Sequence, residues 1–501
     1  MQTATIPSLP YELLAMSFKY LAKLTSPERR PLTALHIAHT CRRFREVALN
    51  CPELWTTIGG LRRSGAEASD CEWLDFFLER SKALPLDVIV ECRAFDITSS
   101  EASASRAVPL LDNVYSKCIL QLDRWKSVTW RVKCTRGAVL PVEGIEGVGI
   151  ELSRAKHGRR KRVAPNLKTI TFEIDTSQRA NKEYLDGYFA QLKSIDFFLN
   201  WKMPILEEFN VCDLPYSFEF RPFMWPRRKK DCLNFTSFSG SWMAQGSIAS
   251  PVDRFLSFGR SLDSLTVLKL SFGRECVPES YLGVHGAGVE FKSVLEFHLS
   301  YEHNRKLLFA EMVFGRWRFP KAHTLNLKLG IEPLEDLDGD LRSVVRDIVA
   351  DIINYPSVKT FNLGITTTSR PSSERAPVIA VDFPISMLPN LQQLNIISSS
   401  DLILVDMKYD PDVEPVHQYP FPFVQKISLR VPDHRNWTGW LGLVISRIKV
   451  ENNWEKFEGL SISREDEEAE VVIAGHEIED WIKANKFAAG FEPIFEPKYG
   501  Y

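Results

Sequence analysis

The chain has 501 residues, and its 44% hydrophobic and 25% charged residues are ordinary for a folded protein, which excludes a mostly disordered, collagen-like or membrane-embedded chain. Its 62 Lys and Arg stand against 64 Asp and Glu, so no overall positive field attracts nucleic acid. Division by about 150 residues per domain predicts roughly three units.

The nine cysteines form no CxxC pair, and none lies beyond Cys276. This pattern argues against a disulfide framework and a structural zinc site. The first residues lack the basic and then apolar run of a secretory signal, and no apolar window of about 18 residues exists to cross a membrane. We therefore expect a cytoplasmic and/or nuclear protein with no membrane partner.

The sequence of the N-terminal region predicts two or three short helices, the first two of which are joined by a polar connection over residues 22–31. The first helix is predicted within residues 6–21. Pro10 suits its first turn, and Leu14, Phe18 and Leu21 follow at helical spacing. The second is predicted by an i, i+4, i+7, i+11 repeat: Ile37, Cys41, Phe44 and Ala48. Helices this short cannot bury all their apolar groups, so we expect a small module that completes its core against a partner or the following domain.

Three fragments of this region occur in a fixed order. They are Leu9-Pro10-x-Glu12-Leu13-Leu14-x-x-x-Phe18-x-x-Leu21, Cys41-Arg42-Arg43-Phe44-Arg45-x-Val47-Ala48 and Cys51-Pro52-x-Leu54-Trp55. Together they resemble an F-box over about residues 6–58. The chain departs from that pattern at Met16, where the family often has Ile, and at Phe44, which replaces a frequent Trp. A plain helical bundle is the alternative, but it leaves the order of the fragments unexplained.

The resemblance implies docking on the Skp-family adaptor of a cullin-type ubiquitin ligase. The residues that it implies for adaptor binding, some of which must instead be module core, are Leu9, Pro10, Leu13, Leu14, Phe18, Leu21, Cys41, Phe44, Pro52, Leu54 and Trp55. The continuation over residues 73–90 is similar to large F-box families of mushroom-forming fungi.

A segment of the form apolar-x-x-apolar-x-apolar recurs along the rest of the chain. Its instances begin at Trp125, Leu167, Leu206, Leu265, Val294, Ala322, Val358, Leu391, Val424 and Phe457, with a weak copy at Phe235. Alternation with period two predicts short strands that are buried on one face. Helical spacing between some of them, as in residues 341–352 and 441–448, predicts stacked strand–helix units.

This arrangement resembles a leucine-rich-repeat solenoid, although no asparagine row occupies the turns. The expected fold class is therefore α/β, with a small N-terminal helical F-box module followed by an irregular leucine-rich-repeat-like α/β solenoid. The expected divisions are residues 1–60 for the helical module, 61–120 for linking helices and a first strand, 121–475 for the solenoid, and 476–501 for a C-terminal helix or cap and tail. An irregular α/β domain is the alternative.

In such a solenoid the residues between the apolar anchors line one open face, where we expect a protein target to bind. The candidate residues are Lys269, Ser271, His298, Asn326, Lys328, Asn362, Asn395 and Arg430. Two basic clusters lie at residues 154–162 and 227–230. Each is a solvated loop, a nuclear-import signal or a patch for an acidic partner.

No catalytic residue, metal site or cofactor is predicted, because the chain lacks GxxxxGK[ST], GxGxxG and HExxH. We therefore expect a non-enzymatic substrate-recognition subunit of a Skp–cullin–F-box ligase that binds no nucleic acid. An F-box scaffold acting outside a ligase, or a hydrolase or transferase in the α/β region, remains an alternative.

Overall fold

The structure is a computed structural model that divides into two compact units, Met1–Gln245 and Gly246–Tyr501. It describes residues 9–59, 72–93, 95–96, 117–133, 138–139, 162–175, 201–212, 235–242, 246–247, 263–273, 276–277, 289–302, 314–331, 344–349, 351–367, 379–383, 385–399, 402–405, 421–431, 438–450, 454–463, 470–474, 477–478, 480–481 and 484. Both basic clusters lie almost wholly outside these residues, as does most of the expected C-terminal helix.

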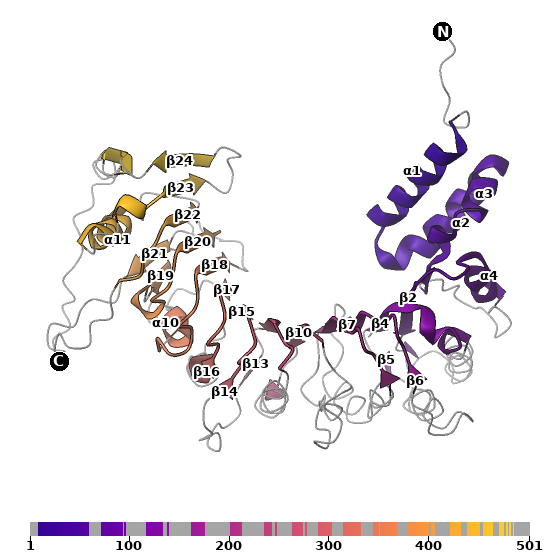
Figure 1. Ribbon diagram of the computed structural model, residues 1–501, viewed down its shortest axis with the longest axis horizontal. Coiled ribbons are helices and arrows are strands. Elements are labelled where there is room, and N and C mark those ends of the chain that lie inside the picture. The colour runs from indigo at the N-terminus through magenta and orange to yellow at the C-terminus, as the bar shows by residue number, and fades with distance from the viewer. Residues whose placement is uncertain are drawn as a thin grey trace, which may run out of the picture. The chain divides into compact units, whose positions relative to one another are not determined.

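The expected α/β class is confirmed, with a long, mostly parallel sheet and an N-terminal helical region (Figure 1). The helices of the first unit are α1 (Tyr11–Leu24), the 3-10 helix η2 (Pro27–Arg29), α2 (Arg30–Thr40), α3 (Arg42–Leu49), the 3-10 helix η3 (Pro52–Trp55) and α4 (Glu72–Arg80). We refer to α1 through η3 as the helical module.

Two expectations about this module are wrong. The connection over residues 22–31 is largely helical, because α1 continues to Leu24 and η2 fills most of the remainder. The second helix is in fact two helices, since Cys41 adopts an extended conformation between α2 and α3. Its Sγ accepts a hydrogen bond from the backbone N–H of Phe44 and so caps the start of α3.

Six strands of the first unit belong to the long sheet, in chain order. They are β1 (Thr57–Ile58), β2 (Leu86–Arg93), β4 (Trp125–Lys133), β7 (Thr169–Asp175), β9 (Glu208–Cys212) and β10 (Ser237–Trp242). Each pairs in parallel with the strand before it. The weak copy at Phe235 therefore does precede a strand.

The second unit contributes eight strands, again in chain order. They are β12 (Val267–Phe272), β15 (Glu296–Glu302), β17 (Thr324–Ile331), β18 (Thr360–Thr367), β20 (Gln393–Ser398), β22 (Lys426–Arg430), β23 (Gly459–Ser463) and β24 (Glu470–Ala474). All neighbours are parallel except β23 and β24, which are antiparallel. The sequence did not predict β24.

Shorter elements accompany the sheet. Two-residue to four-residue strands form separate pairs, which are β3 (Phe95–Asp96) with β5 (Ala138–Val139), β6 (Arg162–Val163) with β8 (Trp201–Lys202), β11 (Gly246–Ser247) with β13 (Cys276–Val277), β14 (Val289–Glu290) with β16 (Trp317–Arg318), and β19 (Ile379–Asp382) with β21 (Leu402–Val405). The remaining 3-10 helices are η4 (Leu122–Arg124), η8 (Phe314–Arg316), η9 (Ile385–Met387) and η12 (Trp454–Lys456). Helix α10 (Val344–Ile348) lies within the predicted helical stretch 341–352, and α11 (Thr438–Val450) contains the predicted stretch 441–448 and extends beyond both of its ends.

The recurring apolar anchors form the core of each unit because parallel pairing brings equivalent anchors into register. Leu325, Phe361, Leu394 and Ile427 are consecutive partners on four neighbouring strands, and all are fully buried. Burial of each such side chain contributes about 1.5–3 kcal/mol. The intervening residues lie on the opposite face of the sheet, since successive strand side chains alternate.

The two-residue step that opens each repeat is a bend held by backbone hydrogen bonds between repeats. The N–H of Lys359 donates to the carbonyl of His323, and the N–H of Gln392 donates to that of Lys359, at 2.9 and 2.8 Å. The same contact joins Gln425 to Gln392 at 2.7 Å. These bonds align successive strands before the regular ladder begins.

Candidate interaction surfaces

The inner face of α1 is built from the residues that the F-box-like pattern places at helical spacing. Leu14 and Phe18 are buried, and the rings of Phe18 and Phe44 meet edge to face with centroids 5.0 Å apart. This pair joins α1 to α3, so Phe18 belongs to the core of the module and the partly covered Phe44 packs against it.

Trp55 joins the helical module to the segment that follows it. Its indole Nε1 donates to the carbonyl of Ala48 at 2.8 Å, and its ring meets Phe76 and Phe77 of α4 edge to face. Trp55 and Leu54 are both buried. We expected a partner or the following part of the chain to cover such groups, and for Trp55 the chain's own α4 does so in part.

The outer face of α1 carries a continuous apolar stripe, defined by Leu13, Met16, Tyr20 and Leu24. These side chains are spaced by three, four and four residues, which places them on one side of the helix. Their exposed fractions are 47, 65, 65 and 67%. Nothing in the described part of the chain covers this stripe, and exposed apolar groups gathered in this way mark interaction sites.

The structure thus divides the eleven residues predicted for adaptor binding. Leu14, Phe18, Leu54 and Trp55 are core, whereas Pro10, Leu13 and Leu21 are exposed. Cys51 is also buried, and burial raises the pKa of its thiol to about 11, so it is not a reactive thiolate. The other four predicted residues are partly covered. They are Leu9, Cys41, Phe44 and Pro52.

Sequence reasoning missed Met16, Tyr20 and Leu24 as surface residues. Met16 was noted only as a departure from the family pattern, and Leu24 was assigned to the connection. Extension of the helical spacing beyond Leu21 was the signal that could have found them.

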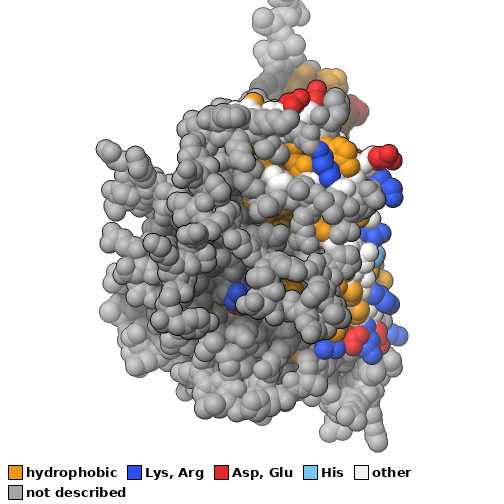
Figure 2. All heavy atoms as spheres, turned by 90° about the vertical axis from the view of Figure 1, so that its left-hand side faces the viewer, with side chains coloured by type: hydrophobic (Ala, Val, Ile, Leu, Met, Phe, Trp, Pro, Cys, Tyr) orange, Lys and Arg blue, Asp and Glu red, His pale blue; other side chains and the backbone are white. Residues whose placement is uncertain are grey.

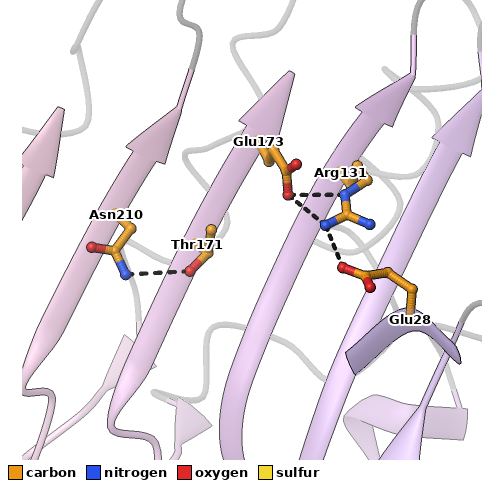
Figure 3. A network of polar contacts seen from close by, with 5 residues as sticks. All are labelled: Glu28, Arg131, Thr171, Glu173 and Asn210. Carbon is orange, nitrogen blue, oxygen red and sulfur yellow. Dashed lines mark hydrogen bonds and ion pairs between the residues drawn. The ribbon is translucent and has the colours of Figure 1, made fainter. Parts of the chain in front are cut away.

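The helical module is fixed to the sheet by an ion network centred on Arg131 of β4 (Figure 3). Its Nη2 donates to Glu28 of η2 at 2.7 Å, while Nε and Nη2 both donate to Glu173 of β7, at 2.9 and 2.7 Å. The Arg131 side chain is only 13% exposed. Hydrogen bonds between charged groups are stronger where the groups are shielded from solvent than where they are fully exposed.

Burial and hydrogen bonding act in opposite directions on these charges. Burial alone would raise the pKa of Glu28, but hydrogen bonds from Arg131, its own backbone and Ser26 lower that pKa overall. Burial opposes the charged form of Arg131, yet the two carboxylates raise the pKa of its guanidinium. Both shifts favour the charged forms of Glu28 and Arg131, and the ion pair between them holds η2 against β4.

A second contact lies farther along the same face, where Asn210 of β9 donates to Thr171 of β7 at 3.4 Å (Figure 3). In the second unit the corresponding polar row is more regular. Asn395 of β20 donates to Asn362 of β18 at 2.6 Å, and Asn362 donates to Asn326 of β17 at 2.6 Å. We call these three residues the asparagine ladder.

The ladder ends at His298 of β15, whose Nε2 lies 3.4 Å from Nδ2 of Asn326. Burial lowers the pKa of His298, the charge of Lys269 lowers it further, and Glu296 opposes both. A neutral imidazole can accept the amide hydrogen of Asn326, so all three amides donate in one direction.

All eight residues predicted for target binding lie on the face opposite the buried anchors. Lys269, His298, Asn326, Asn362 and Asn395 are consecutive partners in one row. Ser271 pairs with Ser300 in the next row, which also contains Lys328, Gly364, Ile397 and Arg430. The structure therefore brings these residues together on one sheet face.

The described residues hold no group of three or more His, Cys, Asp or Glu side chains arranged for a metal ion. Within the same residues, no helix combines the length and apolar character needed to span a bilayer. The described residues thus form two candidate surfaces, an apolar stripe on α1 and a polar face of the sheet. In the comparisons with known proteins, no protein-family model and no curated protein matches this chain.

Proposed function

We propose that this chain is the substrate-recognition subunit of a Skp–cullin–F-box ubiquitin ligase. The observation that carries the proposal is the uncovered apolar stripe of α1, which lies beside a core built from the F-box-like motif residues. A helix face of this kind fits docking against a second protein. The adaptor would cover Leu13, Met16, Tyr20 and Leu24, together with Pro10 and Leu21.

The strands support a leucine-rich-repeat-like solenoid as the receptor part. Each repeat adds one parallel strand beside the previous one, and each carries its buried anchors at the same register. Repeats of this kind cannot bury their apolar faces alone, so stacking supplies their core. The open polar face of the second unit would bind the target.

The mechanism that we propose is proximity. The adaptor-bound chain would hold a target close to a ubiquitin-loaded enzyme and so raise its effective concentration. The Arg131 network suits this role because it fixes the helical module against the first strands. The chain itself would contribute no bond chemistry.

Capture of a purified Skp-family adaptor by the tagged full-length chain tests the docking step. Met16→Asp combined with Tyr20→Asp places charges within the stripe and is expected to weaken capture by at least about 100-fold. Leu120→Asp is the matched control, because Leu120 is equally exposed in the first unit but lies outside the stripe. Capture that survives the double substitution would reject the proposal.

The F-box scaffold remains the second candidate, since the same apolar stripe would serve it. Reconstitution with adaptor, cullin and ubiquitin-charging enzymes separates the two: a receptor supports ubiquitin transfer to a bound target, whereas a scaffold binds the adaptor without such transfer.

A further inference from the structure

The polar face of the second unit has an uneven distribution of charge. On the four neighbouring strands β17, β18, β20 and β22, together with the bends that lead into them, residues 321–330, 357–366, 390–399 and 423–431 contain no Asp or Glu. The same segments carry exposed Lys328, Lys359, Lys426 and Arg430. The chain as a whole has a net charge of only −2, so this concentration of cations is local.

The cations lie on both sides of the asparagine ladder. Lys426 pairs with Gln393, which lies two residues before Asn395 on β20. Lys426 therefore belongs to the outward-facing row that precedes the ladder row. Lys328 and Arg430 belong to the row beyond the ladder, joined through Gly364 and Ile397. With neighbouring strands about 4.8 Å apart, the Cα atoms of Lys328 and Arg430 are separated by roughly 14 Å, a span that several residues of an extended segment can cover.

The groups between these cations suit a peptide. Gly364 leaves a low point in the row, because an added Cβ there would meet only ordinary contacts, the nearest at 3.7 Å. Ile397 beside it is an exposed aliphatic side chain in an otherwise polar face. The ladder amides offer hydrogen-bonding groups to a backbone. Figure 2 shows several Lys and Arg side chains along one margin of the described surface, with Asp and Glu side chains among them in places.

From this arrangement we infer that the face formed by β17, β18, β20 and β22 binds an acidic, extended segment of a partner protein. The inference rests on the proposed receptor function, since the segment would belong to the target. Its carboxylates pair with Lys328, Arg430 and Lys426, and its backbone or amide groups meet the asparagine ladder. Such complementarity sets specificity and the rate of encounter.

A protein segment fits better than a single-stranded nucleic acid. Binding of unpaired bases uses exposed aromatic rings for stacking. Among the described residues of the second unit, the exposed large apolar side chains are Leu295, Ile353, Ile397 and Val472, none of which is aromatic.

The test uses the full-length chain and fluorescence anisotropy. The probe is a fluorescein-labelled peptide of alternating Glu and Ser, compared with the same peptide carrying Gln in place of every Glu, and with labelled oligothymidylate. Binding of the Glu peptide is expected, with weakening of at least about tenfold when salt rises from about 25 to about 300 mM. The Gln peptide is expected to bind weakly or not at all.

Charge reversal locates the site. Lys328→Glu combined with Arg430→Glu is expected to weaken Glu-peptide binding by at least about tenfold. Arg318→Glu is the matched control, because Arg318 is exposed on β16 of the same unit but belongs to a separate two-stranded sheet. Circular dichroism and thermal unfolding check that each variant is folded.

Three results would overturn the inference: equal binding of the Gln peptide, unchanged binding by the folded double variant, or stronger binding of oligothymidylate. Adaptor capture is measured in parallel with the same variants. Failure of capture alone rejects the ligase role and leaves peptide binding intact, whereas loss of peptide specificity alone rejects only the acidic partner.

Discussion

Arg131 binds Glu28 across 103 residues of sequence, and this contact joins a 3-10 helix of the helical module to a strand of the sheet. The same guanidinium holds Glu173 on the next strand. One largely covered side chain therefore holds the module against the first strands of the sheet.

Substitution of Arg131 by Met should reduce the free energy of unfolding by about 2 kcal/mol, because it leaves Glu28 and Glu173 close together without their shared cation. Urea denaturation measures the change. Lys168→Met is the control, since Lys168 pairs with Glu207 at a more exposed site and should cost less than about 1 kcal/mol. Equal costs for the two variants would show that the network contributes no more than a surface pair.

Acid should weaken the same contact. The folded-state pKa of Glu28 is lowered, so its contribution is present in full above the ordinary pKa of about 4.5 and is lost as pH falls through the folded value. The difference in unfolding free energy between wild type and Glu28→Gln should therefore shrink between about pH 6 and pH 3. A difference that stays constant or grows over that range would contradict the assignment.

The sequence predicted the strands well because each anchor is a local signal. Period-two alternation depends only on which face of a strand is buried, and the Leu325, Phe361 and Leu394 segments show it without interruption. Their parallel order followed from the near-constant spacing. The eight residues predicted for target binding share one face for the same reason, because they are the residues between anchors.

The sequence did not predict features that depend on the backbone conformation of one residue or on contacts between residues far apart in the chain. The break at Cys41 preserves the helical spacing of the apolar residues on either side, so periodicity could not reveal it. The pairing of Glu28 with Arg131 crosses a separation that no local pattern encodes. The sorting of Leu13 from Leu14 needed the packing of α1 against its neighbours.

The asparagine ladder should stabilise the second unit modestly. Asn362 both donates to Asn326 and accepts from Asn395, so Asn362→Ala removes two hydrogen bonds and should cost about 1–2 kcal/mol. Ser428→Ala, one strand beyond Asn395 in the same row, should change stability by less than about 0.5 kcal/mol. Chemical denaturation of both variants compares them, and equal effects would mean that the ladder bonds add nothing.

His298 should titrate below an ordinary histidine. Its pKa is lowered by burial first and by Lys269 second, while Glu296 opposes them. NMR titration of its ring protons should therefore show a higher pKa in Lys269→Met and a still lower pKa in Glu296→Gln. The reverse order would show that these neighbours do not control the imidazole.

The same lowered pKa fixes the direction of the stability change. Because the unfolded chain binds the proton more readily, the contribution of neutral His298 is complete above about pH 6.5 and is lost as pH falls through the folded value. Denaturation of wild type and His298→Gln over this range measures it. The stability advantage of wild type over the variant should diminish at low pH.

Substitution by alanine should change the stability of the second unit in opposite directions at two of its glycines. Gly459 opens β23 with φ of +154°, and an added Cβ would lie 2.7 Å from the carbonyl oxygen of Ile473 on β24. Gly442 lies within α11, where an added Cβ meets nothing within 4 Å. Gly459→Ala should therefore destabilise the unit by about 2 kcal/mol or more, whereas Gly442→Ala should stabilise it by about 0.5–1 kcal/mol.

Thermal and urea denaturation of the two alanine variants checks both signs. Gly459 matters because it allows β24 to approach β23, the one antiparallel pairing of the described long sheet. If Gly459→Ala unfolds no more readily than wild type, β24 does not approach β23 as closely as the structure places it. The stabilising Gly442→Ala variant then serves as the reference that shows the assay can resolve changes of this size.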